Sequence, residues 1–99
     1  MKFLEVTPMV KCYGKKGAEN LEVSCDNVFL NVSHIVAVTP VYDELDWTDG
    51  ISEVIHHLDQ SFVKLSSPIR ISDKIIAVSD VRVIGGPHKI AEEIKKLKG

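Results

Sequence analysis

The C-terminal segment constrains the fold of this chain more than any other part of the sequence. Residues 78–83 read Val-Ser-Asp-Val-Arg-Val, an alternation of apolar and polar side chains that is typical of a half-buried antiparallel strand. Gly85-Gly86 ends this strand, and Pro87 suits the first position of a helix, where a missing N–H costs nothing. One apolar stripe then follows at helical spacing: Ile90, Ala91, Ile94 and Leu97. The segment therefore predicts an amphipathic helix that packs on an antiparallel sheet.

The remaining apolar runs predict the other strands of that sheet. They are short and rich in Val, Ile and Leu, and they occupy residues 3–10, 21–24, 28–32, 34–41, 62–65 and 69–84. Asp26-Asn27 separates two of these runs, and we expect it to form the tight turn of a hairpin between them. Pro8 lacks an N–H and predicts a sheet edge or a bulge in the first strand. The expected fold is α+β: a small antiparallel sheet of about five strands, open or partly closed, with the C-terminal helix packed on it.

Residues 42–60 differ in composition from the rest of the chain. They hold six acidic residues, no Lys or Arg, and the only Trp. Within them the apolar residues Ile51, Val54, Ile55 and Leu58 have i, i+3, i+4, i+7 spacing, which predicts a short helix. Residues 42–60 are therefore expected to form an acidic insertion, with a helical part, between two strands.

Length and composition indicate one soluble domain over residues 1–99. The chain is 44% hydrophobic and 26% charged, as expected for a globular domain, and its net charge of −2 argues against a dedicated nucleic-acid binder. Cys12 and Cys25 do not resemble a secreted disulfide framework. Residues 1–4 lead straight into a strand-like run instead of a signal peptide, and no apolar run approaches the ~20 residues that span a bilayer. We expect a cytoplasmic protein with reduced cysteines and no membrane association.

The sequence contains no recognisable catalytic motif. His56-His57 is the best candidate for a metal site, but adjacent residues on a helix point about 100° apart and do not easily face one ion. There is no Gly-x-Ser-x-Gly motif, and neither cysteine has a reactive context. We therefore expect no metal, no cofactor and no enzymatic activity.

Gly85-Gly86-Pro87-His88 is a weak candidate for an anion site, because the N–H groups at a helix start attract phosphate. A strand-to-helix turn explains the same glycines without a ligand.

A protein-interaction surface is the leading functional hypothesis. The acidic insertion combines negative charge with aromatic residues, which often anchor protein interfaces, and its charge favours a basic partner. The predicted partner-binding residues are Tyr42, Asp43, Glu44, Asp46, Trp47 and Asp49. In the alternative interpretation, Trp47 closes over the core. Unpaired sheet edges also make a homo-oligomer reasonable.

Nucleic-acid binding is the alternative function. It would use two groups of lysines, provided that the loop carrying the first group lies near the C-terminal helix. The residues are Lys11, Lys15, Lys16, Lys89, Lys95 and Lys96.

Two stretches carry a family resemblance. Residues 28–40, Val-Phe-Leu-Asn-Val-Ser-His-Ile-Val-Ala-Val-Thr-Pro, and the strand and helix start of residues 81–94 resemble very small bacterial and phage β proteins, in particular the small flagellar and swarming-motility protein family. The resemblance implies a strand, a tight corner, a second strand and a strand-then-helix ending. The strand pattern is also similar to that of LytTR-type DNA-binding domains. We therefore expect a small non-enzymatic interaction or regulatory module of bacterial or phage origin.

Overall fold

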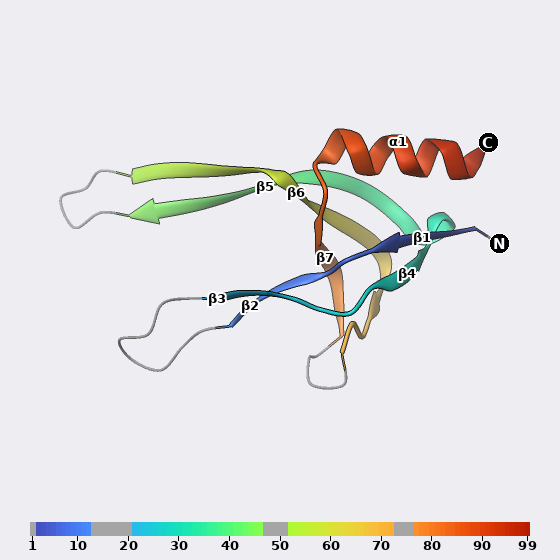
Figure 1. Ribbon diagram of the computed structural model, residues 1–99, viewed down its shortest axis with the longest axis horizontal. Helices are drawn as coiled ribbons and strands as arrows, with labels where there is room; N and C mark the ends of the chain where they lie inside the picture. The colour runs from blue at the N-terminus through green and yellow to red at the C-terminus, as the bar shows by residue number, and fades with distance from the viewer. Residues whose placement is uncertain (1, 13–20, 47–51, 73–76) are drawn as a thin grey trace.

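The computed structural model describes residues 2–12, 21–46, 52–72 and 77–99, which form antiparallel strands and one C-terminal helix (Figure 1). The strands in chain order are β1 (Phe3–Val6), β2 (Met9–Cys12), β3 (Leu21–Ser24), β4 (Val28–Asn31), β5 (Ile35–Asp46), β6 (Ser52–Ile69) and β7 (Val78–Ile84). A short 3-10 turn, η1 (Val32–His34), joins β4 to β5, and the helix α1 spans Pro87–Lys98. Antiparallel strands with a C-terminal helix confirm the expected α+β class.

The N-terminal strands form a long, bent ribbon. β1 pairs with β4, and β2 pairs with β3, both antiparallel. The predicted hairpin across Asp26-Asn27 is therefore wrong, because β3 and β4 are successive parts of one side of the ribbon. At the bend, the Asn27 side chain donates to the Glu5 carboxylate at 2.9 Å and accepts from the Thr7 hydroxyl. The polar side chain that suggested a turn binds the neighbouring strand instead.

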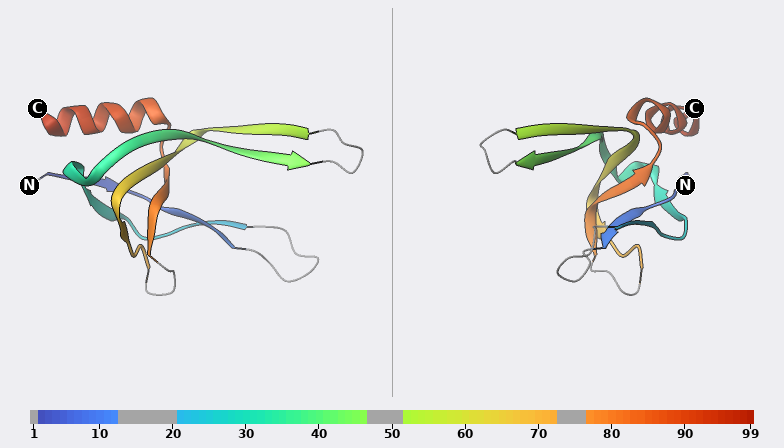
Figure 2. Two further views of the ribbon diagram at one scale, coloured as in Figure 1. Left: turned by 180° about the vertical axis from the view of Figure 1, so that it is seen from behind. Right: turned by 60° about the vertical axis from the view of Figure 1, so that its left-hand side comes forward.

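Pro8 lies at the break between β1 and β2, in agreement with the predicted irregularity. It is buried and forms an isolated bridge with Val83 of β7. Next to it, the backbone N–H of Ile84 donates to the carbonyl of Thr7 at 3.0 Å. These contacts join the N-terminal ribbon to the second sheet, whose strand order is β5-β6-β7. The described strands are divided among separate sheets instead of forming one, and they do not close into a barrel, so of the two predicted forms the open one is observed (Figure 2).

The helix predicted over residues 51–58 is wrong over its described part, residues 52–58. Residues 52–58 belong to β6, and residues 42–46 belong to β5, which pairs with it from Val41↔His57 to Asp46↔Ser52. Val54 and Ile55 are β-branched and favour strands, and pairing between β5 and β6 satisfies the backbone groups that the two segments direct toward each other. The helical spacing was a coincidence of four apolar residues.

The core lies between the β1–β4 pair, the β5–β6–β7 sheet and the helix. Its buried members are Leu4, Val6, Leu30, Val32, Val63, Leu65, Val81, Val83 and Ile90. From the helix, Ile90 is only 3% exposed, and Ile94 and Leu97 pack partly against this cluster. The predicted packing of the helix stripe is thus confirmed except at Ala91, which is exposed.

Ser61 makes a buried polar contact at the junction of sheet and helix. Its side chain is fully buried, and its hydroxyl donates to the Gly85 carbonyl at 2.6 Å. Replacing Ser61 by alanine leaves that carbonyl without this donor, so we expect the free energy of unfolding to fall by about 1–2 kcal/mol. Urea denaturation measures the change. The exposed Ser79→Ala is the matched control, and an equal effect in both variants would contradict the prediction.

Candidate functional site

The part of the β5–β6 hairpin formed by residues 41–46 and 52–57 extends away from the body of the protein, and we call it the arm (Figure 1). The pairing of β6 with β7 starts only at Gln60↔Ile84. Among the described residues, the arm therefore consists of two strands with no third strand beside them. The overall dimensions of 50 × 29 × 19 Å reflect this elongated shape.

The structure places four of the six predicted partner-binding residues on one strand of the arm. Tyr42 is 61% exposed and pairs with His56 across the hairpin. Asp43, Glu44 and Asp46 follow it along β5 and pair with Ile55, Val54 and Ser52 respectively. Trp47 and Asp49 lie outside the described residues. The predicted acidic surface is thus, over its described part, a β-strand instead of a loop or helix.

Two grooves meet where the arm joins the body, and both are lined by Pro40 and His56. The larger, of about 730 Å³, is also lined by Tyr42, Phe62 and Lys64. The ring centroids of Tyr42 and His56 are 6.3 Å apart and the rings are tilted by 49°. This groove combines aromatic rings with charged groups, which suits it to contact a side chain of a partner.

The second groove, of about 510 Å³, lies between the arm and the start of α1. Leu58 lines it with a side chain that is 85% exposed, beside Val41, Pro87 and Lys89. Sequence reasoning missed Leu58 as a surface residue because it assigned this leucine to a helix stripe. Phe62 was missed for a different reason: alternation along a strand does not show which of its faces a partner could reach.

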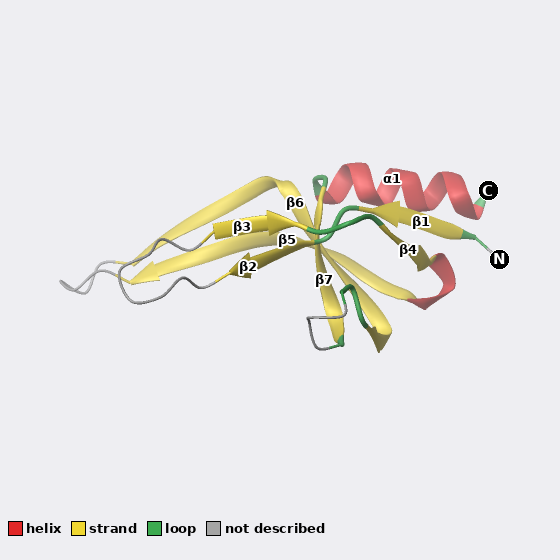
Figure 3. Cartoon of the chain, turned by 60° about the horizontal axis from the view of Figure 1, so that its bottom comes forward, coloured by secondary structure: helices red, strands yellow, loops and turns green. Residues whose placement is uncertain are grey.

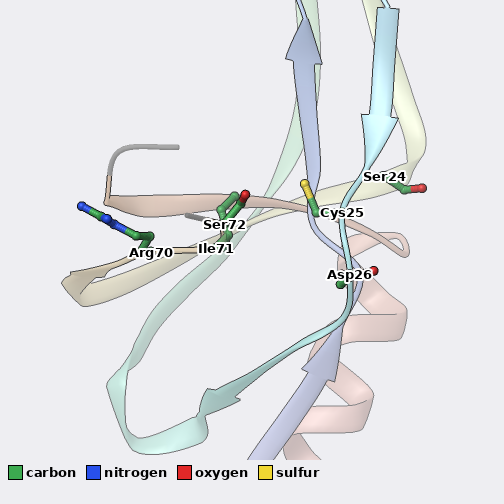
Figure 4. Close-up of a pocket in the computed structure, with 6 residues that line it drawn as sticks. All are labelled: Ser24, Cys25, Asp26, Arg70, Ile71 and Ser72. Carbon is green, nitrogen blue, oxygen red and sulfur yellow. The ribbon is translucent and has the colours of Figure 1, made fainter. Parts of the chain in front are cut away.

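A further pocket, of about 570 Å³, lies where the β3–β4 link approaches the chain that follows β6. Figure 4 shows that its polar side chains do not converge: the Arg70 guanidinium points away from the Cys25 sulfur, and Asp26 lies on the other side of the cysteine. This arrangement offers no nucleophile with a neighbouring base.

Within the described residues, no group of three or more His, Cys, Asp and Glu side chains could hold a metal ion. His56 and His57 are neighbours on a strand, so their side chains point to opposite faces of the hairpin. Two imidazoles on opposite faces of a hairpin do not converge on one ion.

Packing against β6 accounts for the Gly85-Gly86 pair. Gly85 has φ +122°, a conformation that favours glycine, and its N–H donates to the Asp59 carbonyl at 2.7 Å. A Cβ on Gly86 would lie 2.6 Å from the Leu58 carbonyl oxygen. Both glycines thus let the chain turn closely against β6 before α1 starts, which supports the strand-to-helix interpretation over an anion site.

The described lysines of the nucleic-acid hypothesis do not form one patch. Lys11 is in β2, whereas the exposed Lys89, Lys95 and Lys96 are on α1. The β2–β3 ribbon and the helix extend to opposite ends of the molecule (Figures 1 and 3). Lys15 and Lys16 lie outside the described residues.

No protein-family model, curated protein or solved structure matches the chain. The resemblance to the flagellar and swarming-motility family therefore stays a prediction. The tight corner that it implied is present as η1, where the Asn31 side chain accepts from the Ser33 backbone N–H at 3.0 Å. Over the described part of the chain, no helix has the length and apolar character needed to cross a membrane.

Proposed function

We propose that this chain is a protein-interaction module that binds a basic segment of a partner protein through the arm and the grooves at its base. The observation that carries the proposal is the arm itself, an acidic two-stranded hairpin that extends from the core with exposed apolar side chains at its base.

The first argument concerns stability. An isolated two-stranded hairpin is marginally stable in water because it buries little apolar surface. Val41 is buried where the arm joins the body, and beyond it, among the described strands, β5 and β6 pair only with each other. A partner that packs on the arm would bury more of its apolar surface and so stabilise the two strands.

The second argument concerns the kind of contact. Tyr42 and Leu58 are 61% and 85% exposed, and each lines one of the grooves that meet at Pro40. Large side chains beside a groove are typical of the anchors that contribute most of the binding energy at an interface. A partner that inserts its own apolar side chain there would cover both residues.

The third argument concerns charge. Residues 42–60 contain six carboxylates and no Lys or Arg, although the whole chain has a net charge of only −2. Such a local excess of negative charge attracts a basic segment and repels acidic ones, which adds to association rate and specificity. The partner expected here therefore presents Lys or Arg beside an apolar side chain.

The test is a pulldown of protein partners with the triple variant Asp43→Asn, Glu44→Gln, Asp46→Asn. We expect the variant to lose about tenfold in affinity for partners that the unmodified protein retains after nuclease treatment, because three attractive charges are removed. Titration of each purified partner measures the affinity.

The control variant Asp26→Asn, Glu92→Gln, Glu93→Gln removes the same number of charges away from the arm. It should bind like the unmodified protein. Partners that bind all three proteins equally well would show that the arm is not the docking surface.

Nucleic-acid binding keeps one supporting observation, the exposed lysines of α1. If that function is the correct one, the retained material is sensitive to nuclease, its binding weakens steeply with salt, and Lys95→Gln with Lys96→Gln reduces it while the arm variant does not.

A further inference from the structure

The larger groove at the base of the arm lies on the outer face of the β5–β6–β7 sheet. Val63 and Val81 are paired with each other and fully buried, so their side chains point into the core. Successive residues of a strand point to opposite faces, so Phe62, Lys64 and Asp80 point away from the core. All three line this groove, whose volume is about 730 Å³.

Three aromatic side chains line the same groove: Tyr42, His56 and Phe62. Tyr42 is 61% exposed, His56 is also exposed, and Phe62 is half-buried. The Tyr42 and His56 rings are tilted by 49° at a centroid distance of 6.3 Å, so neither ring covers the face of the other by parallel stacking. The face of an aromatic ring attracts a cation, and a planar guanidinium also stacks on it.

The groove holds one carboxylate and one ammonium group, from the exposed Asp80 and Lys64. The two residues are opposite each other in the register of β6 and β7. Over the described part of the chain, however, their side chains form no ion pair or hydrogen bond with each other or with another residue. Arg82, also on this face, donates from its Nε to the Gln60 side-chain oxygen at 2.7 Å. The Asp80 carboxylate therefore remains available to a cation from outside.

From these rings and this carboxylate we propose that the larger groove binds an arginine side chain of the partner protein, with the guanidinium on the Tyr42 ring and paired with the Asp80 carboxylate. The inference rests on the proposed function, because it names the residue of the basic partner segment that enters this groove. A guanidinium is planar, always charged, and donates two parallel hydrogen bonds to a carboxylate, whereas a lysine ammonium matches only the charge. The apolar side chain of the partner then occupies the second groove, beside Leu58.

Lys64 makes the sign of the charge effects decisive. Its ammonium repels a guanidinium in the groove, whereas it would attract a carboxylate or a phosphate. We therefore expect Asp80→Asn to weaken arginine binding by about fivefold, and Lys64→Gln to leave it unchanged or to strengthen it. An anion in the groove would reverse both effects.

The first measurement uses a single arginine as the probe. Nα-acetyl-arginine amide is titrated into the full chain and followed by NMR of the backbone amides. We expect a Kd of about 1–10 mM, as for a small ligand, with shifts centred on Thr39, Phe62 and Asp80. Nα-acetyl-citrulline amide has the same shape without the charge and should bind at least about fivefold more weakly. Equal binding of the two probes, or no shift at the groove, would overturn the proposal.

Variants of the groove then test each contact with the arginine probe. Tyr42→Leu should weaken binding by about fivefold, whereas Tyr42→Phe keeps the ring and should bind like the unmodified protein. Glu92→Gln removes an exposed carboxylate from α1 and is the matched control for Asp80→Asn. Weaker binding in Lys64→Gln with unchanged binding in Asp80→Asn would contradict the proposal. Circular dichroism of each variant verifies the fold.

The pulldown of protein partners separates this inference from the proposed function. If the triple variant of the arm loses the partners while Asp80→Asn binds them as tightly as the unmodified protein, the arm is the docking surface and the arginine assignment is wrong. If Asp80→Asn and Tyr42→Leu lose affinity while the triple variant does not, the groove binds the partner and the acidic arm does not. Loss of affinity in both supports the two proposals together.

Discussion

Replacing Ile90 by aspartate is expected to lower the free energy of unfolding by at least about 3 kcal/mol, a large share of the 5–15 kcal/mol typical of a domain. Ile90 is 3% exposed and belongs to the same buried cluster as Leu4, Val63 and Val83. It is the deepest contact of α1, so an aspartate there either brings an unpaired carboxyl group into the core or releases the helix from the sheet. Urea denaturation followed by circular dichroism measures the loss.

The next residue provides the control, because Ala91 lies on the exposed side of the same helix turn. Ala91→Asp should change the free energy of unfolding by about 0.5 kcal/mol or less. Ile94→Asp should fall between the two, since Ile94 is only partly buried. If Ile90→Asp melts within a few degrees of the unmodified protein, the helix does not hold the core as described.

Replacing Gly86, the N-cap residue of α1, by alanine is expected to cost about 2 kcal/mol, although its φ of −66° is one that alanine adopts without strain. The added Cβ would lie 2.6 Å from the carbonyl oxygen of Leu58, and a backbone atom cannot move aside as a flexible side chain does. Either the first turn of α1 or the edge of β6 must shift, which loosens the contacts on both sides. The midpoint of urea denaturation gives the change in stability.

Leu58→Ala distinguishes the backbone contact from a side-chain effect. The Leu58 side chain is 85% exposed, so its truncation should alter stability by only about 0.5 kcal/mol. It should also leave the cost of Gly86→Ala unchanged in the double variant, because the clash is with the carbonyl. A double variant as stable as Leu58→Ala alone would show that the side chain, and not the backbone, limits the space at Gly86.

The candidate site was only partly predictable. Local composition identified Tyr42, Asp43, Glu44 and Asp46, since six carboxylates without a basic residue stand out in any folded context. Phe62, Leu58 and Lys64 were not identified, because what brings them beside the arm is the register of β6 with its neighbours. Register depends on contacts between segments far apart in the chain, and no short pattern reports it.

The distinction between local patterns and contacts between distant segments also separates the correct from the incorrect predictions of secondary structure. For residues 52–58, three apolar residues (Val54, Ile55 and Leu58) match helical spacing, while the β-branched side chains of two of them match a strand, and the local signals conflict. The pairing partner on β5 decides between them. At Asp26-Asn27 the Asn27 side chain does form hydrogen bonds with nearby polar groups, as in a turn. Its partners, however, are Thr7 and Glu5, and the bonds stabilise a bend in the ribbon instead of a hairpin turn.

The sequence by itself determined the C-terminal unit of this protein: a half-buried strand, the Gly85-Gly86 turn, Pro87 at the helix start and a stripe centred on Ile90 and Ile94. Each of these depends on interactions within a few residues, so the local pattern was sufficient. The tertiary structure decided which strands pair, that the acidic residues lie on a two-stranded arm, and that two grooves meet at Pro40. These features depend on hydrogen bonds and packing between distant segments, whose energies exceed local preferences.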